Sequence, residues 1–191
     1  MAPLDTSIRA TLIDLLESQG RNQEALGHYI QLGKNYKQLG NVDGAREALV
    51  MAQQLSKRFG GDTDQLVSIK HQIADIDMTR LDVRRAQRSY EEILQIVPED
   101  ERAQRNLIDI LFSQSNSTEG IKRLDALLGM YAKNRQVTPI LKTLEELTKH
   151  FPEEIGLRSR LAGIYRQMNR NADAIAQLDS LGDLQLKAGM N

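Results

Sequence analysis

The 191-residue sequence contains no cysteine and no tryptophan, and aromatic residues make up only 4% of it. The absence of cysteine excludes disulfide bridges, thiolate metal ligands and thiol redox chemistry. The three histidines, His28, His71 and His150, lie too far apart in sequence to form a local metal-binding pair. Glycine-rich phosphate loops, the Gly-x-Ser-x-Gly nucleophile turn and calcium-binding loops are also missing. We therefore expect a protein that is not an enzyme and needs no metal or cofactor.

An excess of one charge sign is missing too. The chain has 25 Lys+Arg against 26 Asp+Glu, which gives a net charge of −1. Proteins that bind nucleic acids or anionic membranes need an excess of cationic residues, so neither partner is expected. No apolar run is long enough to span a bilayer, and no signal peptide opens the sequence. We expect a cytoplasmic protein with the composition of a globular one.

Glycine and proline are scarce inside the periodic segments and concentrate between them. Within most segments, apolar residues recur at intervals of three and four, which is typical of amphipathic helices. No convincing strand remains, so the predicted fold class is all-α, and connections this short predict that each helix runs antiparallel to the one before. The ten expected helices cover residues 5–18, 22–39, 42–59, 62–78, 82–97, 99–114, 117–134, 137–150, 153–168 and 171–188.

One pair of helices shows how neighbouring segments are expected to pack. Gly33 follows Leu32 in the first helix, Tyr36 comes one turn later, and Ala45 and Leu49 lie in the second helix. A glycine inside a helix costs about 0.5–1 kcal/mol relative to alanine. It is worth keeping only where a neighbouring helix approaches closely, so we expect Gly33 to lie against the small residue Ala45.

This pattern resembles the tetratricopeptide repeat, a helix–turn–helix unit of about 34 residues, in a degenerate form of bacterial type. The resemblance recurs at 67–100, 101–134 and 155–188, although the usual tryptophan is absent and Asp77 replaces an aromatic residue. It implies one domain over 1–191, a right-handed α-solenoid of antiparallel hairpins. The hairpins are expected at about 26–59, 67–100, 101–134 and 155–188, with extra helices at about 5–18 and 137–150.

In tetratricopeptide proteins, the first helices of the hairpins line a groove that binds peptides. Carried over position by position, the resemblance implies a groove that contains Lys34, Lys37, His71, Asp75, Arg102, Arg105, Asp109, Phe112 and Arg166. Lysine and arginine are most numerous among these residues, which favours an acidic peptide. The lysine–asparagine pair with which chaperone-binding members hold a terminal carboxylate is absent, because Lys34 lies where asparagine would be.

The expected function is therefore that of a protein–protein interaction scaffold. Two alternatives remain open: a structural module that self-assembles, and a regulatory arm of a larger multidomain protein. Self-association is suggested by the last helix, where Leu181, Gly182, Gln185 and Gly189 partly repeat the spacing of a first helix. The six arginines between positions 80 and 105 suggest an anion site or, as we favour, a solvated face interleaved with acidic residues.

Overall fold

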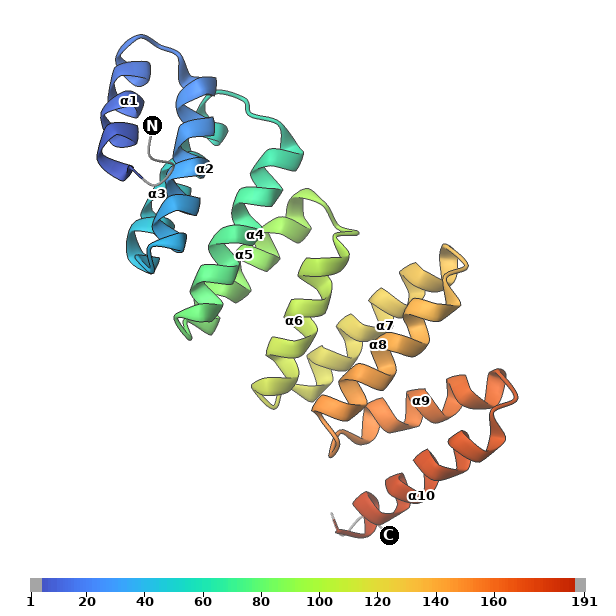
Figure 1. Ribbon diagram of the computed structural model, residues 1–191. Helices are drawn as coiled ribbons and strands as arrows, with labels where there is room; N and C mark the ends of the chain where they lie inside the picture. Colours follow the sequence, from blue (N-terminus) through green and yellow to red (C-terminus); the bar gives the residue numbers. More distant parts are fainter. Residues whose placement is uncertain (1–4, 188–191) are drawn as a thin grey trace. The chain divides into compact units, whose positions relative to one another are not determined.

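The computed structural model describes residues 5–187, and these residues form ten α-helices and no strand (Figure 1). The helices are α1 (Thr6–Ser18), α2 (Asn22–Gln38), α3 (Val42–Arg58), α4 (Thr63–Thr79), α5 (Val83–Ile96), α6 (Glu101–Ser113), α7 (Ser117–Lys133), α8 (Val137–His150), α9 (Ile155–Gln167) and α10 (Asn171–Lys187). The all-α prediction is confirmed, and each expected helix is present with ends shifted by at most two residues. Gly189, which we included in the pattern of the last helix, lies outside the described residues.

The chain divides into two compact units, with the boundary between Ala103 and Gln104, inside α6. Each unit is described by itself below. The expectation of one continuous domain over 1–191 stays a prediction.

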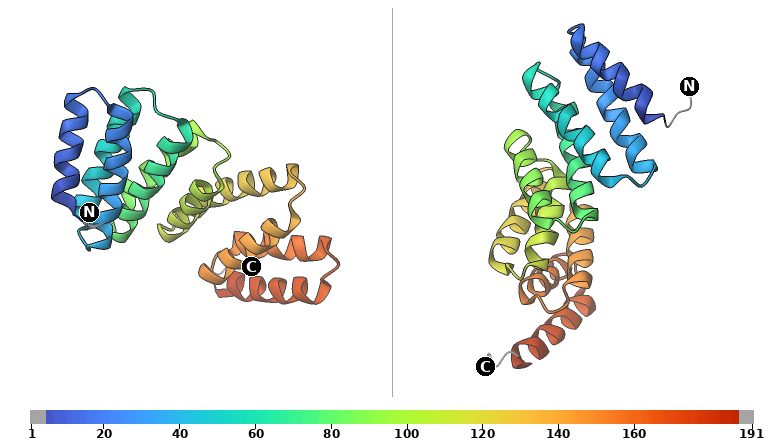
Figure 2. Two further views of the ribbon diagram at one scale, coloured as in Figure 1. Left: turned by 45° about the horizontal axis from the view of Figure 1, so that its top comes forward. Right: turned by 90° about the vertical axis from the view of Figure 1, so that its left-hand side faces the viewer.

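Seven of the turns between helices use the same backbone device. One residue in each adopts a left-handed conformation, and the next N–H donates to a carbonyl in the last turn of the preceding helix, as from Arg21 to Leu16 at 2.9 Å. This closure satisfies the free carbonyls and reverses the chain within a few residues. The hairpins α2–α3 and α9–α10 consequently run antiparallel (Figures 1 and 2). The left-handed residues are Gly20, Gly40, Gly60, Leu81, Ser115, Arg135 and Asn169.

In the first unit, α2 and α3 pack as closely as the sequence predicts. A Cβ atom added to Gly33 would lie 2.9 Å from Leu49 Cγ and 3.3 Å from the Ala45 carbonyl oxygen. Such distances leave no room for a methyl group, so Gly33 is required by the approach of α3. Leu49 and Ala45 belong to a buried apolar cluster that continues through Ile69 and Ile73 of α4.

Buried charges also join neighbouring helices of the first unit. Asp77 is fully buried in α4 and accepts hydrogen bonds from Arg46 of α3, at 2.5 Å from Nε and 3.2 Å from Nη2. Lys70 of α4 is similarly buried and forms an ion pair with Glu92 of α5. Asp77 thus takes the place of an aromatic side chain by pairing with an arginine from the preceding helix.

The second unit has one apolar core, formed by α6 to α10. Tyr131 of α7 and Leu144 of α8 are fully buried in it. Polar contacts tie α9 to two earlier helices: Arg160 donates two hydrogen bonds to Asp125 of α7, at 2.6 and 2.7 Å, and the Tyr165 hydroxyl donates to Glu145 of α8 at 2.8 Å. The bond from Tyr165 holds α9 against α8, the helix that lies between two repeat hairpins in sequence.

The close packing of α2 on α3 generates the first testable prediction. Gly33→Ala should lower the free energy of unfolding by about 1–2 kcal/mol, because the added methyl group overlaps Leu49. Gly27→Ala, in the same helix, should instead raise it by up to about 1 kcal/mol, because no atom lies within 4 Å of the added Cβ and alanine favours the helix. Urea unfolding of both variants measures the difference, and equal effects would contradict the packing described.

Candidate functional site

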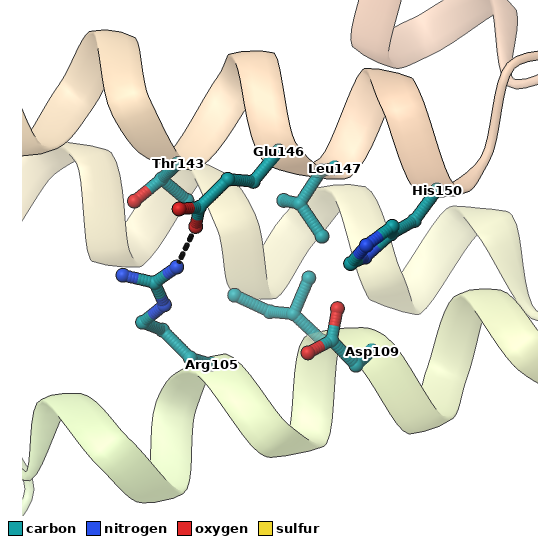
Figure 3. Close-up of a pocket in the computed structure, with 7 residues that line it drawn as sticks. Arg105, Asp109, Thr143, Glu146, Leu147 and His150 are labelled. Atoms are coloured by element: carbon teal, nitrogen blue, oxygen red, sulfur yellow. Dashed lines mark hydrogen bonds and ion pairs between the residues drawn. The ribbon is translucent and has the colours of Figure 1, made fainter.

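A small pocket lies in the second unit, between α6 and α8 (Figure 3). It has a volume of about 70 Å³. Pockets for small-molecule ligands typically measure about 300–1,000 Å³, so this one has room for a few water molecules or the end of one side chain. Its walls combine apolar and polar groups from the two helices: Arg105, Ile108, Asp109, Thr143, Glu146, Leu147 and His150.

Some polar side chains of the pocket have hydrogen-bond or ion-pair partners, and others have none among the described residues. Arg105 of α6 donates a hydrogen bond to Glu146 of α8 and forms an ion pair with it across the pocket (Figure 3). Thr143 is only 2% exposed, and its hydroxyl has no hydrogen-bond partner among the described residues. Asp109 points toward Leu147 and His150 of α8 without a hydrogen bond or ion pair in the described part of the chain. The pocket therefore offers an unpaired carboxylate and an unpaired hydroxyl.

The environment of Asp109 disfavours its charge. Burial of the carboxyl raises its pKa above the ordinary value, and the neighbouring Glu146 adds to this effect. His150 and Arg105 act in the opposite direction and only partly offset it. Asp109 as a whole residue is exposed to solvent, so water screens its charge and limits the effect. A cationic group placed against the carboxyl would relieve this imbalance.

The structure brings Arg105 and Asp109 together in the pocket but places the other predicted residues of the second unit elsewhere. Phe112 is 4% exposed and belongs to the apolar core, where its ring lies 5.4 Å from that of Phe151. It also fills the space beside Gly120, where an added Cβ would approach the ring to 3.1 Å. Phe112 thus contributes packing. Arg166 is exposed in the last turn of α9 and does not line the pocket.

In the first unit, three of the predicted residues engage other side chains. His71 is buried, and its Nε2 lies 3.1 Å from Asp100 Oδ2. Arg102 forms an ion pair with Asp75, with Nη2 at 2.5 and 2.7 Å from the two carboxylate oxygens. Lys34 and Lys37 are exposed on α2, and neither has a partner within the described range. Within the first unit, these two lysines present the cationic surface that the sequence predicts.

Five pocket residues were missed by the sequence analysis: the apolar Ile108 and Leu147, and the polar Thr143, Glu146 and His150 of α8. The three polar residues share one feature. Their spacing of three and four places them on one face of the helix, as for Arg105 and Asp109 in α6. This spacing was a usable signal. Residues 137–150 lie outside the repeat frame, so the resemblance assigns them no groove position.

Most of the other candidate features are structural. Arg80 and Arg85 form ion pairs with Asp43 and Asp82, which agrees with the solvated-face interpretation of the arginine-rich stretch. Within residues 5–187, no group of three or more metal-ligating side chains converges on one point. Over the same residues, no helix has the length and apolar character needed to cross a bilayer.

Comparison with known proteins agrees with this architecture. A family model described as "Tetratricopeptide repeat" matches residues 71–135. No curated protein is significantly similar in sequence. Three solved structures share the fold at low identity. RapI in its apo form has a TM-score of 0.61 at 13% identity, over 95% of this chain and 48% of that longer one. BtubC from P. vanneervenii has a TM-score of 0.53 at 18% identity, over 96% of this chain and 80% of that one. A tetratricopeptide repeat protein from Parabacteroides merdae has a TM-score of 0.53 at 15% identity, over 95% of this chain and 79% of that one.

The described residues thus define a helical-hairpin repeat protein. Similarity at such low identity shows the fold alone. The family model identifies the repeat in the sequence itself, over most of the two adjoining repeats predicted at 67–100 and 101–134. Residues 71–135 match the tetratricopeptide-repeat model, and the described residues share the fold of a solved tetratricopeptide repeat protein.

The raised pKa of Asp109 generates the second prediction. The folded state holds the proton more tightly than the unfolded state, so ionised Asp109 lowers the stability of the fold at neutral pH. This loss disappears as the pH falls below the unfolded pKa of about 3.9. Asp109→Asn should therefore raise the urea midpoint at pH 7 and change it progressively less as the pH approaches 4.

The matched control is Asp179→Asn, an exposed aspartate of α10 outside the pocket. It should leave the midpoint nearly unchanged at both pH values. A loss of stability in Asp109→Asn at pH 7 would show that the carboxylate is favourably paired and would contradict the geometry of the pocket.

Proposed function

We propose that this chain is a non-enzymatic interaction module of the cytoplasm that binds a segment of another protein across its exposed helix faces. The observation that carries the proposal is the pocket between α6 and α8, which has room for the end of one side chain and is too small for a typical metabolite. Proteins that recognise extended or helical segments commonly use such pockets for individual side chains along a surface groove.

The fold supports this function. Each helix of a repeat array packs on its chain neighbours and leaves the opposite face available to a partner. In the second unit, α6 and α8 present paired and unpaired charged groups around the same pocket. A surface of this kind can select a partner by shape and by charge and needs no catalytic group.

We further propose that an acidic part of the partner contacts α2. Lys34 and Lys37 are three residues apart and therefore lie on one face of the helix. Both are exposed, and neither is paired with a described residue. Arg102 and Arg105, by contrast, are engaged by Asp75 and Glu146. The case for an acidic ligand consequently rests on the two lysines.

A second candidate function is structural self-association through α10. Ile175, Leu178 and Leu186 are 57%, 51% and 68% exposed and lie along one stripe of this helix. Gly182 lies on the same stripe, with no atom within 4 Å of an added Cβ. Because Gly33 of α2 occupies a comparable position and is covered by α3, a helix from a second copy is the occupant that this stripe would fit.

Selection from a displayed library of random peptides, with the full chain as bait, tests the interaction function. We expect convergent families of peptides, among them acidic ones. Lys34→Glu/Lys37→Glu should weaken binding of the acidic families by roughly tenfold or more, because attraction becomes repulsion at two positions. The control, Lys57→Glu/Lys133→Glu, reverses two other exposed lysines and should have little effect.

The outcomes separate the candidates. The absence of any convergent family would contradict the interaction function. Acidic families that bind both lysine variants equally would contradict the contact with α2. A mass that rises with concentration in sedimentation equilibrium, without selected peptides, would favour self-association.

A further inference from the structure

We propose that the pocket between α6 and α8 is a specificity site for one basic side chain, lysine or arginine, of the bound partner segment. This inference rests on the proposed function and adds the chemistry of one contact to it. It differs from the sequence-based expectation of an acidic ligand, because the two units present different charges: unpaired lysines on α2 and an unpaired carboxylate beside α8.

The charges around the pocket favour a cation. Two carboxylates and one guanidinium line it. Arg105 and Glu146 neutralise each other through their ion pair. Asp109 is left without an ion pair or hydrogen bond among the described residues, in surroundings that disfavour its negative charge. A lysine ammonium or an arginine guanidinium would supply the missing partner and form a charge-assisted hydrogen bond.

The shape of the pocket favours a long side chain. Ile108 and Leu147 supply apolar walls, against which the methylene stem of lysine or arginine can lie while its charged end reaches a polar group. The end of a basic side chain can enter the pocket, with its charge toward Asp109.

Thr143 is an independent sign of an occupant. A buried hydroxyl without a partner is unfavourable, and most buried polar groups in proteins are paired. Thr148 on the same helix is also buried with an unpaired hydroxyl, but it does not line the pocket. Of the two threonines, only Thr143 can therefore bond to a group that enters the pocket.

An anionic occupant is disfavoured by the same contacts. It would approach Asp109 and would compete with Glu146 for Arg105, which would leave Glu146 with Lys142 as its ion-pair partner. The two carboxylates thus exclude acidic side chains from this position.

The test uses peptides selected with the full chain and measures their affinity by calorimetry. In peptides that bind the second unit, one lysine or arginine should be an anchor. Replacing it with norleucine, which keeps the stem and removes the charge, should weaken binding roughly tenfold to a hundredfold, and so should Asp109→Asn in the protein. Thr143→Val should weaken it by roughly threefold to tenfold.

Matched controls make the result specific. Asp179→Asn and Thr148→Val remove the same groups outside the pocket and should leave the affinity unchanged. Unfolding curves of all four variants verify that each is folded. Convergent peptides whose affinity is unaffected by Asp109→Asn, or whose anchor is acidic, would overturn this inference and leave the interaction function intact. If no peptide binds at all, both proposals fall.

Discussion

Each helix in this chain can bury its apolar stripe only against helices close to it in sequence, and the rest of the structure depends on that constraint. The apolar clusters follow it: one joins α2, α3 and α4, and another joins α6 to α10. Close approach is the condition for such local burial. It accounts for the glycine at position 33, where the atoms of α3 leave no room for a methyl group.

The same constraint explains where charge is buried. A helix that contacts its chain neighbours on both sides buries many of its positions, and some of these buried positions hold charged residues. Asp77 and Lys70 are buried in α4, and each forms an ion pair with the adjacent helix, α3 in one case and α5 in the other. Because leaving such a charge unpaired would be strongly destabilising, the two pairs specify which helices are neighbours. The Thr143 hydroxyl at the pocket is buried as well, but it has no partner among the described residues.

Much of the fold could be predicted from the sequence because its signals are local. Helix periodicity and the turns around Gly20, Gly40 and Asn169 depend on residues within a few positions of one another. The site was harder to predict. Arg105 and Asp109 were found from the repeat frame, but their partner helix α8 was not, since it lies outside that frame. Phe112 shares their helix face and was expected to line the groove, but Phe151 covers its ring. That contact depends on how α8 packs, which the sequence pattern did not show.

The account claims that the exposed faces of α6 and α8 form one binding surface. Hydrogen exchange of the full chain, measured with and without a selected peptide, tests this claim most directly. The account predicts that the bound peptide slows exchange in both α6 and α8 while α3 is unchanged. Slowed exchange confined to α10, or to α3 and α5, would contradict it.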